Sequence, residues 1–249
     1  GASAIWSNVI KYVGAGAIAT GGVISLLKSL PLIIKTFAGA MKSLKNTSGG
    51  TNVRTDRDLK MPVVLGIILI VIILIWLVPS VPVSLLGAFL IAIFGFFFAT
   101  VSSRMVGLIG SSNNPVSGMA IATLLISTFV LKATGNTGMA GMTGAIAIGS
   151  IICVIAAIAG DTSQDLKTGF IVGATPAKQQ VGELIGVVAS GFAIAGVMSL
   201  LNKAWGFGSA EIPAPQATLM KMIVEGIMDA KLPWVLVFMG VFLALALEV

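Results

Sequence analysis

The sequence predicts an all-α membrane protein, a polytopic membrane helix bundle with at least one re-entrant or broken helix. Hydrophobic residues make up 57% of the 249-residue chain and charged residues only 10%, a balance that excludes an ordinary soluble domain. Several stretches run without a charge for about 20 residues, the length of helix that crosses the hydrocarbon core of a bilayer. Two polar, glycine-containing stretches interrupt this pattern, and they predict the break in the helical course.

The apolar stretches give the expected spans in chain order. An N-terminal stretch over 5–30 contains Lys11 and Lys28, and a second apolar piece starts at Pro31. The stretch over 181–201 has Glu183 as its single charge. The remaining expected spans cover 62–78, 83–103, 116–131 and 138–160, and a further one begins over 234–247. We therefore expect 1–249 to be a single transmembrane domain that is cut from a larger carrier within a helix at each end.

Basic residues are divided unevenly between the connections, and this predicts the orientation. The most basic connection, 42–61, holds Lys42, Lys45, Arg54, Arg57 and Lys60. Alternating spans place three more basic residues on the same side, Arg104, Lys167 and Lys178, and four on the other, Lys132, Lys203, Lys221 and Lys231. Because positive loops stay in the cytoplasm, we expect 42–61 to be a basic cytoplasmic loop and 203–231 an extracytoplasmic loop. Topology, and not nucleic acid, then explains the net charge of +6.

Small residues at four-residue spacing predict where helices pack closely. Without a strong hydrophobic drive in lipid, helices associate through small side chains that let their backbones approach. Two such trios occur, Gly141, Ala145 and Gly149, and Gly182, Gly186 and Ser190. We expect both to be packing seams, although glycines could also hinge a moving helix.

An amphipathic helix is expected near the C-terminus. Apolar residues recur near helical spacing over 219–231, and Lys221, Glu225 and Asp229 lie on another face at four-residue steps. Such a helix lies at the membrane interface or covers the end of the bundle. We expect a surface brace in preference to a gate.

The first polar stretch, GSSNNPVSG over 110–118, is typical of a helix start. Asn114 is the expected N-cap and Pro115 the first helical residue, and an apolar run follows. The helix would then begin near membrane depth, where its free N–H groups could face an anionic substrate group. A tight turn at the interface with an ordinary cap remains an equal alternative.

The second polar stretch, over 161–180, collects acidic, basic and amide side chains, and Thr175 and Pro176 restart a helix after it. That helix carries Glu183 toward its neighbours. Because the chain has no histidine, a proton relay would depend on carboxylates, so Glu183 is the expected proton carrier. The alternative is a structural salt bridge from Glu183 to Arg104 or Lys178.

Other functional classes fit less well. The chain has no histidine and one cysteine, Cys153, and no span holds two carboxylates four residues apart. We therefore expect no enzyme, metal site or cofactor. A channel-like pore could share the polar segments. A non-catalytic membrane subunit would leave them without a role.

Two long motifs resemble a known family. GSSNNPVSGMAIATL over 110–124 and DLKTGFIVGATPAKQQVGELIG over 165–186 are similar, in this order and separation, to the signature regions of the oligopeptide transporter family, which is related to yellow-stripe-like metal-chelate carriers. YVGAGAIATGGVISLLKSLP over 12–31 resembles the helix that precedes a basic loop in that family. The similarity covers nearly the whole chain.

This resemblance implies a secondary active transporter for proton-coupled symport of small oligopeptides or metal chelates, an integral protein of the plasma membrane. It also implies a C-terminal-half fragment, whose partners are the lipid bilayer, the substrate, protons and the remaining helices of the full-length transporter. The matching pathway positions are Asn113, Asn114, Pro115, Asp165, Lys167, Thr168, Gly169, Lys178, Gln179 and Gln180, with Glu183 for proton coupling.

Overall fold

The computed structural model describes residues 5–17, ten positions between 20 and 35, and residues 53–229 and 233–248. Lys42 and Lys45 of the expected cytoplasmic loop lie outside the described residues, as does Lys231 of the expected extracytoplasmic loop. Within the described ranges every regular element is helical. The predicted all-α class is therefore confirmed.

Helices follow one another with short connections. The N-terminal helix includes the π-helical turn η1 (Trp6–Ile10), and two short 3-10 turns occur, η2 (Arg54–Asp56) and η3 (Ser111–Asn113). The α-helices are α3 (Met61–Leu77), α4 (Leu85–Ile109), α5 (Val116–Ala133), α6 (Gly138–Val172), α7 (Pro176–Ala204), α8 (Pro215–Asp229) and α9 (Trp234–Glu248). Five helical segments are long and apolar enough to cross a membrane, those that contain α3, α4, α5, α6 and α7.

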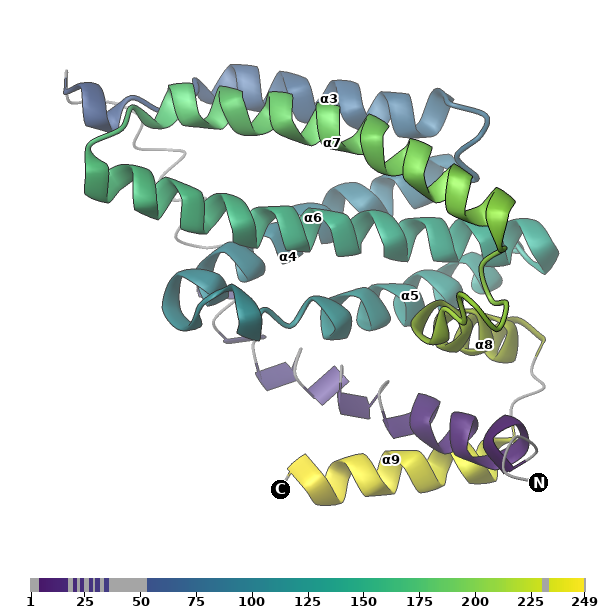
Figure 1. Ribbon diagram of the computed structural model, residues 1–249. Helices are drawn as coiled ribbons and strands as arrows, with labels where there is room; N and C mark the ends of the chain where they lie inside the picture. The colour runs from purple at the N-terminus through teal and green to yellow at the C-terminus, as the bar shows by residue number, and fades with distance from the viewer. Residues whose placement is uncertain are drawn as a thin grey trace.

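The bundle has a buried centre and an outer layer (Figure 1). Helix α6 packs against both α4 and α5, and α8 lies across α5 and α6 at one end. Helices α3 and α7 run along one side of this centre, and neither contains a buried residue. The first residues of α3 and α7 and the last residues of α4 and α6 lie at the same end, at the left of Figure 1. The spans therefore alternate in direction.

Helix α6 packs closely because glycine and alanine make up most of its buried face. Gly141, Ala145 and Gly149 are all buried, so the first expected seam is confirmed. A Cβ atom at Gly149 would lie 3.0 Å from the Leu124 side chain, and one at Gly144 would lie 2.9 Å from the Pro82 carbonyl oxygen. The glycines thus let α5 approach α6 at Gly149 and let the connection before α4 approach it at Gly144.

The second expected seam is wrong for the described residues. A Cβ atom placed on Gly182 or Gly186 would have no atom of the described chain within 4 Å beyond its own helix, and Ser190 is exposed. Helix α7 lies against the bundle through another face, which carries Gln180 and Val187. Four-residue spacing identifies a helix face, but it does not say which neighbour covers that face.

The expected re-entrant or broken helix falls at the connection between α4 and α5, and both of these helices are long enough to cross a membrane, so the described chain has a turn between two spans there. Gly110 ends α4 with φ of 85°, a left-handed conformation that favours glycine, and η3 follows. The chain then turns back, so that Asn114 lies beside Ser102, about two helical turns before the end of α4. Helix α5 consequently starts recessed from that end of the bundle.

The predicted cap of α5 is wrong in detail. The N-cap position is Pro115, one residue later than expected, and the first helical residue is Val116. The Asn114 side chain does not cap the helix: its Nδ2 donates to Ser102 Oγ at 2.7 Å and to the Ala156 carbonyl at 3.3 Å. Ser102 Oγ donates to the same carbonyl. Tertiary hydrogen bonds have therefore replaced the local one.

The expected amphipathic helix is α8. Its buried residues include Ile223, Ile227 and Met228, whereas Lys221 and Glu225 form an exposed ion pair of 3.5 Å. Lys132 at the end of α5 donates from Nζ to the Ile227 carbonyl at 2.5 Å, which satisfies one of the last acceptors of α8. These contacts fix α8 across the end of the bundle, as a brace would lie.

We predict that Gly144→Val lowers the free energy of unfolding by about 1–3 kcal/mol, because the added side chain meets backbone that has no room to move. Denaturant unfolding in detergent micelles measures the change. Gly186→Val is the matched control, since the space around Gly186 is open. Equal losses for the two variants would contradict the packing difference between α6 and α7.

We also predict that Asn114→Ala lowers the free energy of unfolding by about 1–3 kcal/mol, because Ser102 and Ala156 lose a buried donor. Ser111→Ala, an exposed position in the same connection, should change it by less than about 0.5 kcal/mol. The same unfolding assay compares them. An Asn114→Ala protein as stable as the parent would show that this amide does not hold α5 in place.

Candidate functional site

A cavity of about 440 Å³ lies between α3, α6 and α7. Its walls are mostly aliphatic, and four polar side chains reach it, those of Asp58, Thr162, Gln180 and Glu183. The apolar lining comes from Leu59, Met61, Val64, Ile67, Ile68, Ile158, Leu184 and Val187. An apolar hollow with a few convergent polar groups is the usual form of a small-molecule site.

Glu183 is the more buried of the two ionisable groups that line this cavity. The residue is half-buried, and its Oε1 is shielded from solvent without a hydrogen-bond partner among the described residues. Thr162 of α6 lies within hydrogen-bonding reach of the carboxylate, and Asp165 faces it from the same helix. The salt bridges considered from the sequence, to Arg104 or Lys178, are not formed in the described part of the chain. A carboxylate without a cation in such a place is costly unless it binds something.

The second polar motif forms a helical hairpin beside the cavity. Helix α6 continues to Val172, and Gly173 closes it with φ of 72°, after which Pro176 begins α7 as expected. Gln179 folds back on α6, where its Nε2 donates to the Asp165 carbonyl at 2.5 Å. Its amide lies against Gly169, and a Cβ there would collide with it. Gly169 and Gln179 thus let the two helices of the hairpin pack closely against each other.

A short segment before α3 lies across this hairpin. We call Arg54–Leu59 the strap. Arg54 donates to Thr175 Oγ1 at 2.9 Å and to the Gly173 carbonyl at 2.8 Å, and Ala177 N donates to the Arg57 carbonyl at 2.8 Å. The Thr175 hydroxyl therefore accepts a hydrogen bond from Arg54, and it does not cap α7.

Gln180 holds the other end of the strap. Its Nε2 donates to Asp58 Oδ1 at 3.2 Å, and its Oε1 accepts from Leu59 N at 3.0 Å. Because Asp58, Leu59 and Gln180 all line the cavity, these bonds lie at its edge. No sequence pattern indicates this contact, since its partners are about 120 positions apart and share no local signal.

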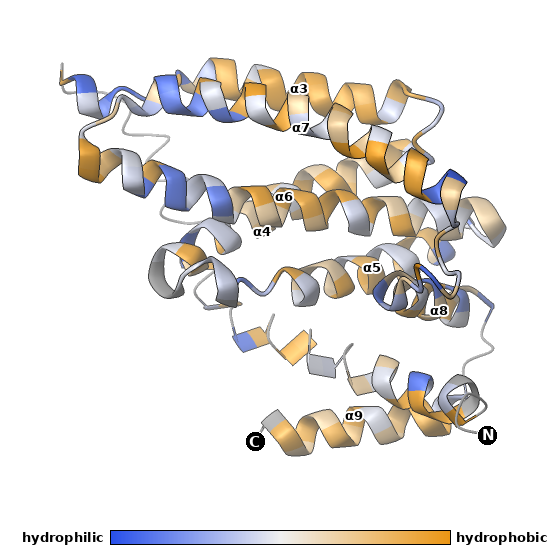
Figure 2. Cartoon of the chain, in the orientation of Figure 1, coloured by the Kyte–Doolittle hydropathy of each residue, from blue (hydrophilic) through white to orange (hydrophobic). Residues whose placement is uncertain are grey.

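The other expected pathway residues are placed unevenly. Asp165, Lys167, Thr168 and Lys178 are exposed, and Lys167 Nζ lies 4.9 Å from the centre of the Phe170 ring. Hydrophilic residues of α6, α7 and η2 gather at this end of the bundle (Figure 2). Asp165, Lys167, Thr168 and Lys178 are among them, and these four residues do not line the cavity.

The first motif lies on another side of α6. Asn114 packs against Ala156 and Gly160, whereas the cavity is lined from Ile158 and Thr162. Residues two apart on a helix point in nearly opposite directions, so α6 separates the two motifs. Pro115 is half-buried at the start of α5, and the side chain of Asn113 lies outside the described residues. The structure does not join the motifs into one site.

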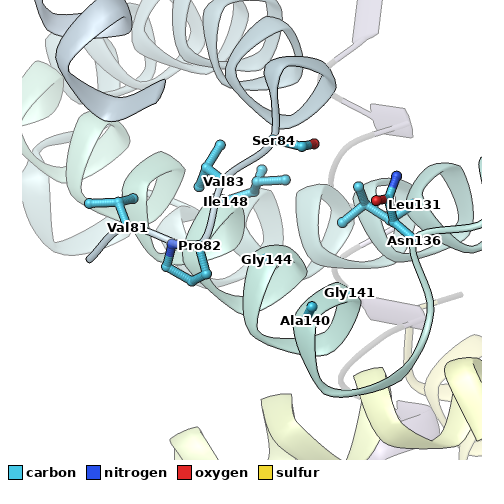
Figure 3. A pocket seen from close by; sticks show the side chains of 10 residues that line it. All are labelled: Val81, Pro82, Val83, Ser84, Leu131, Asn136, Ala140, Gly141, Gly144 and Ile148. Atoms are coloured by element: carbon cyan, nitrogen blue, oxygen red, sulfur yellow. The ribbon is translucent and has the colours of Figure 1, made fainter. Parts of the chain in front are cut away.

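A second cavity, of about 290 Å³, lies at the opposite end of α6 (Figure 3). Its lining contains no charged side chain among the described residues, and its amide, that of Asn136, donates to Thr134 Oγ1 at 3.2 Å. The lining residues are Val81, Pro82, Val83, Ser84, Leu131, Asn136, Ala140, Gly141, Gly144 and Ile148. Without an ionisable group, this hollow has less chemistry to offer than the Glu183 cavity.

Similarity to other proteins agrees with the motifs. The family model described as OPT oligopeptide transporter protein matches residues 1–249. A Haemophilus influenzae protein named "Putative oligopeptide transporter" is 33% identical over 278 residues, covering 99% of this chain and 44% of that protein. A Saccharomyces cerevisiae protein with a similar name is 29% identical over 145 residues, covering 55% of this chain and 19% of its own length.

The chain thus spans less than half the length of these curated relatives. No solved structure is significantly similar to it. The match of the family model over all 249 residues, together with five helices able to cross a membrane, shows that this chain belongs to the oligopeptide transporter family.

Proposed function

We propose that this chain forms part of a proton-coupled symporter of small oligopeptides and that the cavity between α3, α6 and α7 belongs to its transport pathway. Family membership supports the transport activity, and both relatives are named for oligopeptides. The observation that supports the choice of this cavity is that Glu183 Oε1 is shielded from solvent and has no hydrogen-bond partner among the described residues. The remaining helices of the full-length transporter would complete the pathway.

The charges around Glu183 favour a proton as its ligand. Asp165 faces it from α6, Asp58 reaches the cavity from the strap, and the α3 lining is apolar. The ionisable side chains that line the described part of the cavity are both acidic, so no basic side chain of the lining neutralises Glu183. A carboxylate that is protonated on one side of the membrane and released on the other couples cargo movement to the proton gradient.

The same arrangement supports an orientation for the chain in the cell membrane. Arg54, Arg57 and Lys60 precede α3, and the hairpin with Lys167 and Lys178 lies at the same end of the bundle. We place this end in the cytoplasm because basic connections are retained there. The end covered by α8 then faces outward.

We predict that Glu183→Gln abolishes pH-driven accumulation of peptide while peptide exchange continues, because the amide keeps the shape of the side chain but carries no proton. The assay uses the full-length protein in vesicles, with a labelled tripeptide mixture and an imposed pH gradient. Glu211→Gln, an exposed substitution between α7 and α8, is the control and should behave as the parent.

Undiminished pH-driven accumulation by Glu183→Gln would exclude this residue as the proton carrier. Uptake of the peptide mixture that does not saturate would instead indicate a channel-like pore. Saturable uptake of a metal chelate without any peptide uptake would reassign the substrate.

A further inference from the structure

We infer that the strap, Arg54–Leu59, closes the hairpin end of the Glu183 cavity, and that Gln180 is the positioning residue that holds it closed. The inference rests on the proposed function, because it takes this cavity as the transport pathway. It adds a conformational role for a segment that lies outside both sequence motifs.

The strap is attached at both of its ends. Arg54 bonds the hairpin turn at Thr175 and Gly173, and Gln180 bonds the far end through Asp58 and Leu59. Between these two attachments, the Arg57 carbonyl accepts a hydrogen bond from the first turn of α7. These bonds link the strap to the turn and to α7, which are far from it in the chain.

The two attachments differ in what they control. The bonds of Arg54 are exposed and lie on the turn, outside the cavity. Those of Gln180 lie at the cavity wall, where Asp58 and Leu59 contribute to the lining. Loss of the Gln180 bonds would therefore open the cavity at this end, whereas loss of the Arg54 bonds would free the outer part of the strap.

The Gln180 side chain is suited to reversible closure. Its amide donates one hydrogen bond to a carboxylate and accepts one from a backbone N–H, and the bond to the carboxylate is exposed and long at 3.2 Å, so water can replace that partner. The strap continues directly into α3, a helix without a buried residue. Movement of the strap with the first turn of α3 would thus disturb few packed side chains.

Gln179 provides a matched comparison at the next position. It is the same residue type on the same helix, and it is also half-buried. Its amide bonds the Asp165 carbonyl of α6 and makes no hydrogen bond to the strap. Its removal would loosen the hairpin but leave the strap attached.

The test measures access to the cavity and needs no substrate. Ile158 lines the cavity from α6, so Ile158→Cys is introduced into full-length protein in which Cys153 is changed to Ala and other cysteines are removed. A charged, membrane-impermeant maleimide is applied from each side of the membrane in turn. The labelling rate reports how often the cavity is open to that side.

We expect Gln180→Ala to raise the labelling rate from the side of the basic connection about fivefold and to leave the rate from the other side unchanged. A rise of this size corresponds to the loss of ordinary hydrogen bonds. Gln179→Ala should label at the parent rate. Asp58→Ala, an exposed substitution that should not impair folding, removes one of the two bonds and should give a smaller rise in the same direction.

Unchanged labelling in both Gln180→Ala and Asp58→Ala would overturn the inference, as would equal rises in Gln180→Ala and Gln179→Ala. If Gln180→Ala does not reach the membrane, Asp58→Ala decides alone, and an unchanged rate refutes closure. Absence of peptide uptake by the parent would refute the proposed function, but it would leave the labelling result intact.

Discussion

Close packing against the glycines of α6 is the constraint on which the rest of the structure depends. In lipid, apolar side chains gain little by leaving one apolar surface for another, so helices are held by close packing and by hydrogen bonds. Gly144, Gly149 and Gly160 supply the packing, because each leaves a bare patch that a neighbouring element fills. At Gly160 the neighbour is the Asn114 amide, so the glycine face also determines where α5 can begin.

Most buried polar side chains of the described chain have hydrogen-bond partners, and the exceptions are the groups that could bind a ligand. Among the residues that the structure describes, four hydroxyl groups are fully buried, and each donates to a carbonyl: Ser102, Thr123, Ser127 and Thr128. Two buried side-chain acceptors in the described chain lack a partner, Asn114 Oδ1 and Glu183 Oε1. The first belongs to a neutral amide whose nitrogen is well bonded, so a single water would satisfy it. The second belongs to an ionisable group, which can also be satisfied by taking up a proton.

Local signals predicted the spans, the restart of α7 at Pro176 and the amphipathic α8, because each depends on residues close together in the chain. Glu183 was identified as a charge within an apolar stretch, and it lines a cavity, whereas its role in proton coupling stays a prediction. Predictions failed where a distant partner decides the outcome. Asn114 has the composition of a cap, but its amide finds buried partners on α4 and α6. The contacts of Gln180 with the strap also leave no local signal in the sequence, because their partners are about 120 positions apart.

Glu183 lies between helices that the described chain buries to different extents. On one side lies α6, whose contacts with α4 and α5 are close and extensive. On the other side lie α3 and α7, which bury no residue and are joined at one end by the strap. Elements with few buried contacts open at low free energy, whereas a glycine-packed centre resists deformation. A carboxylate at this boundary would experience a different environment if the outer pair moved, so under the proposed function proton binding and helix movement would be linked through one side chain.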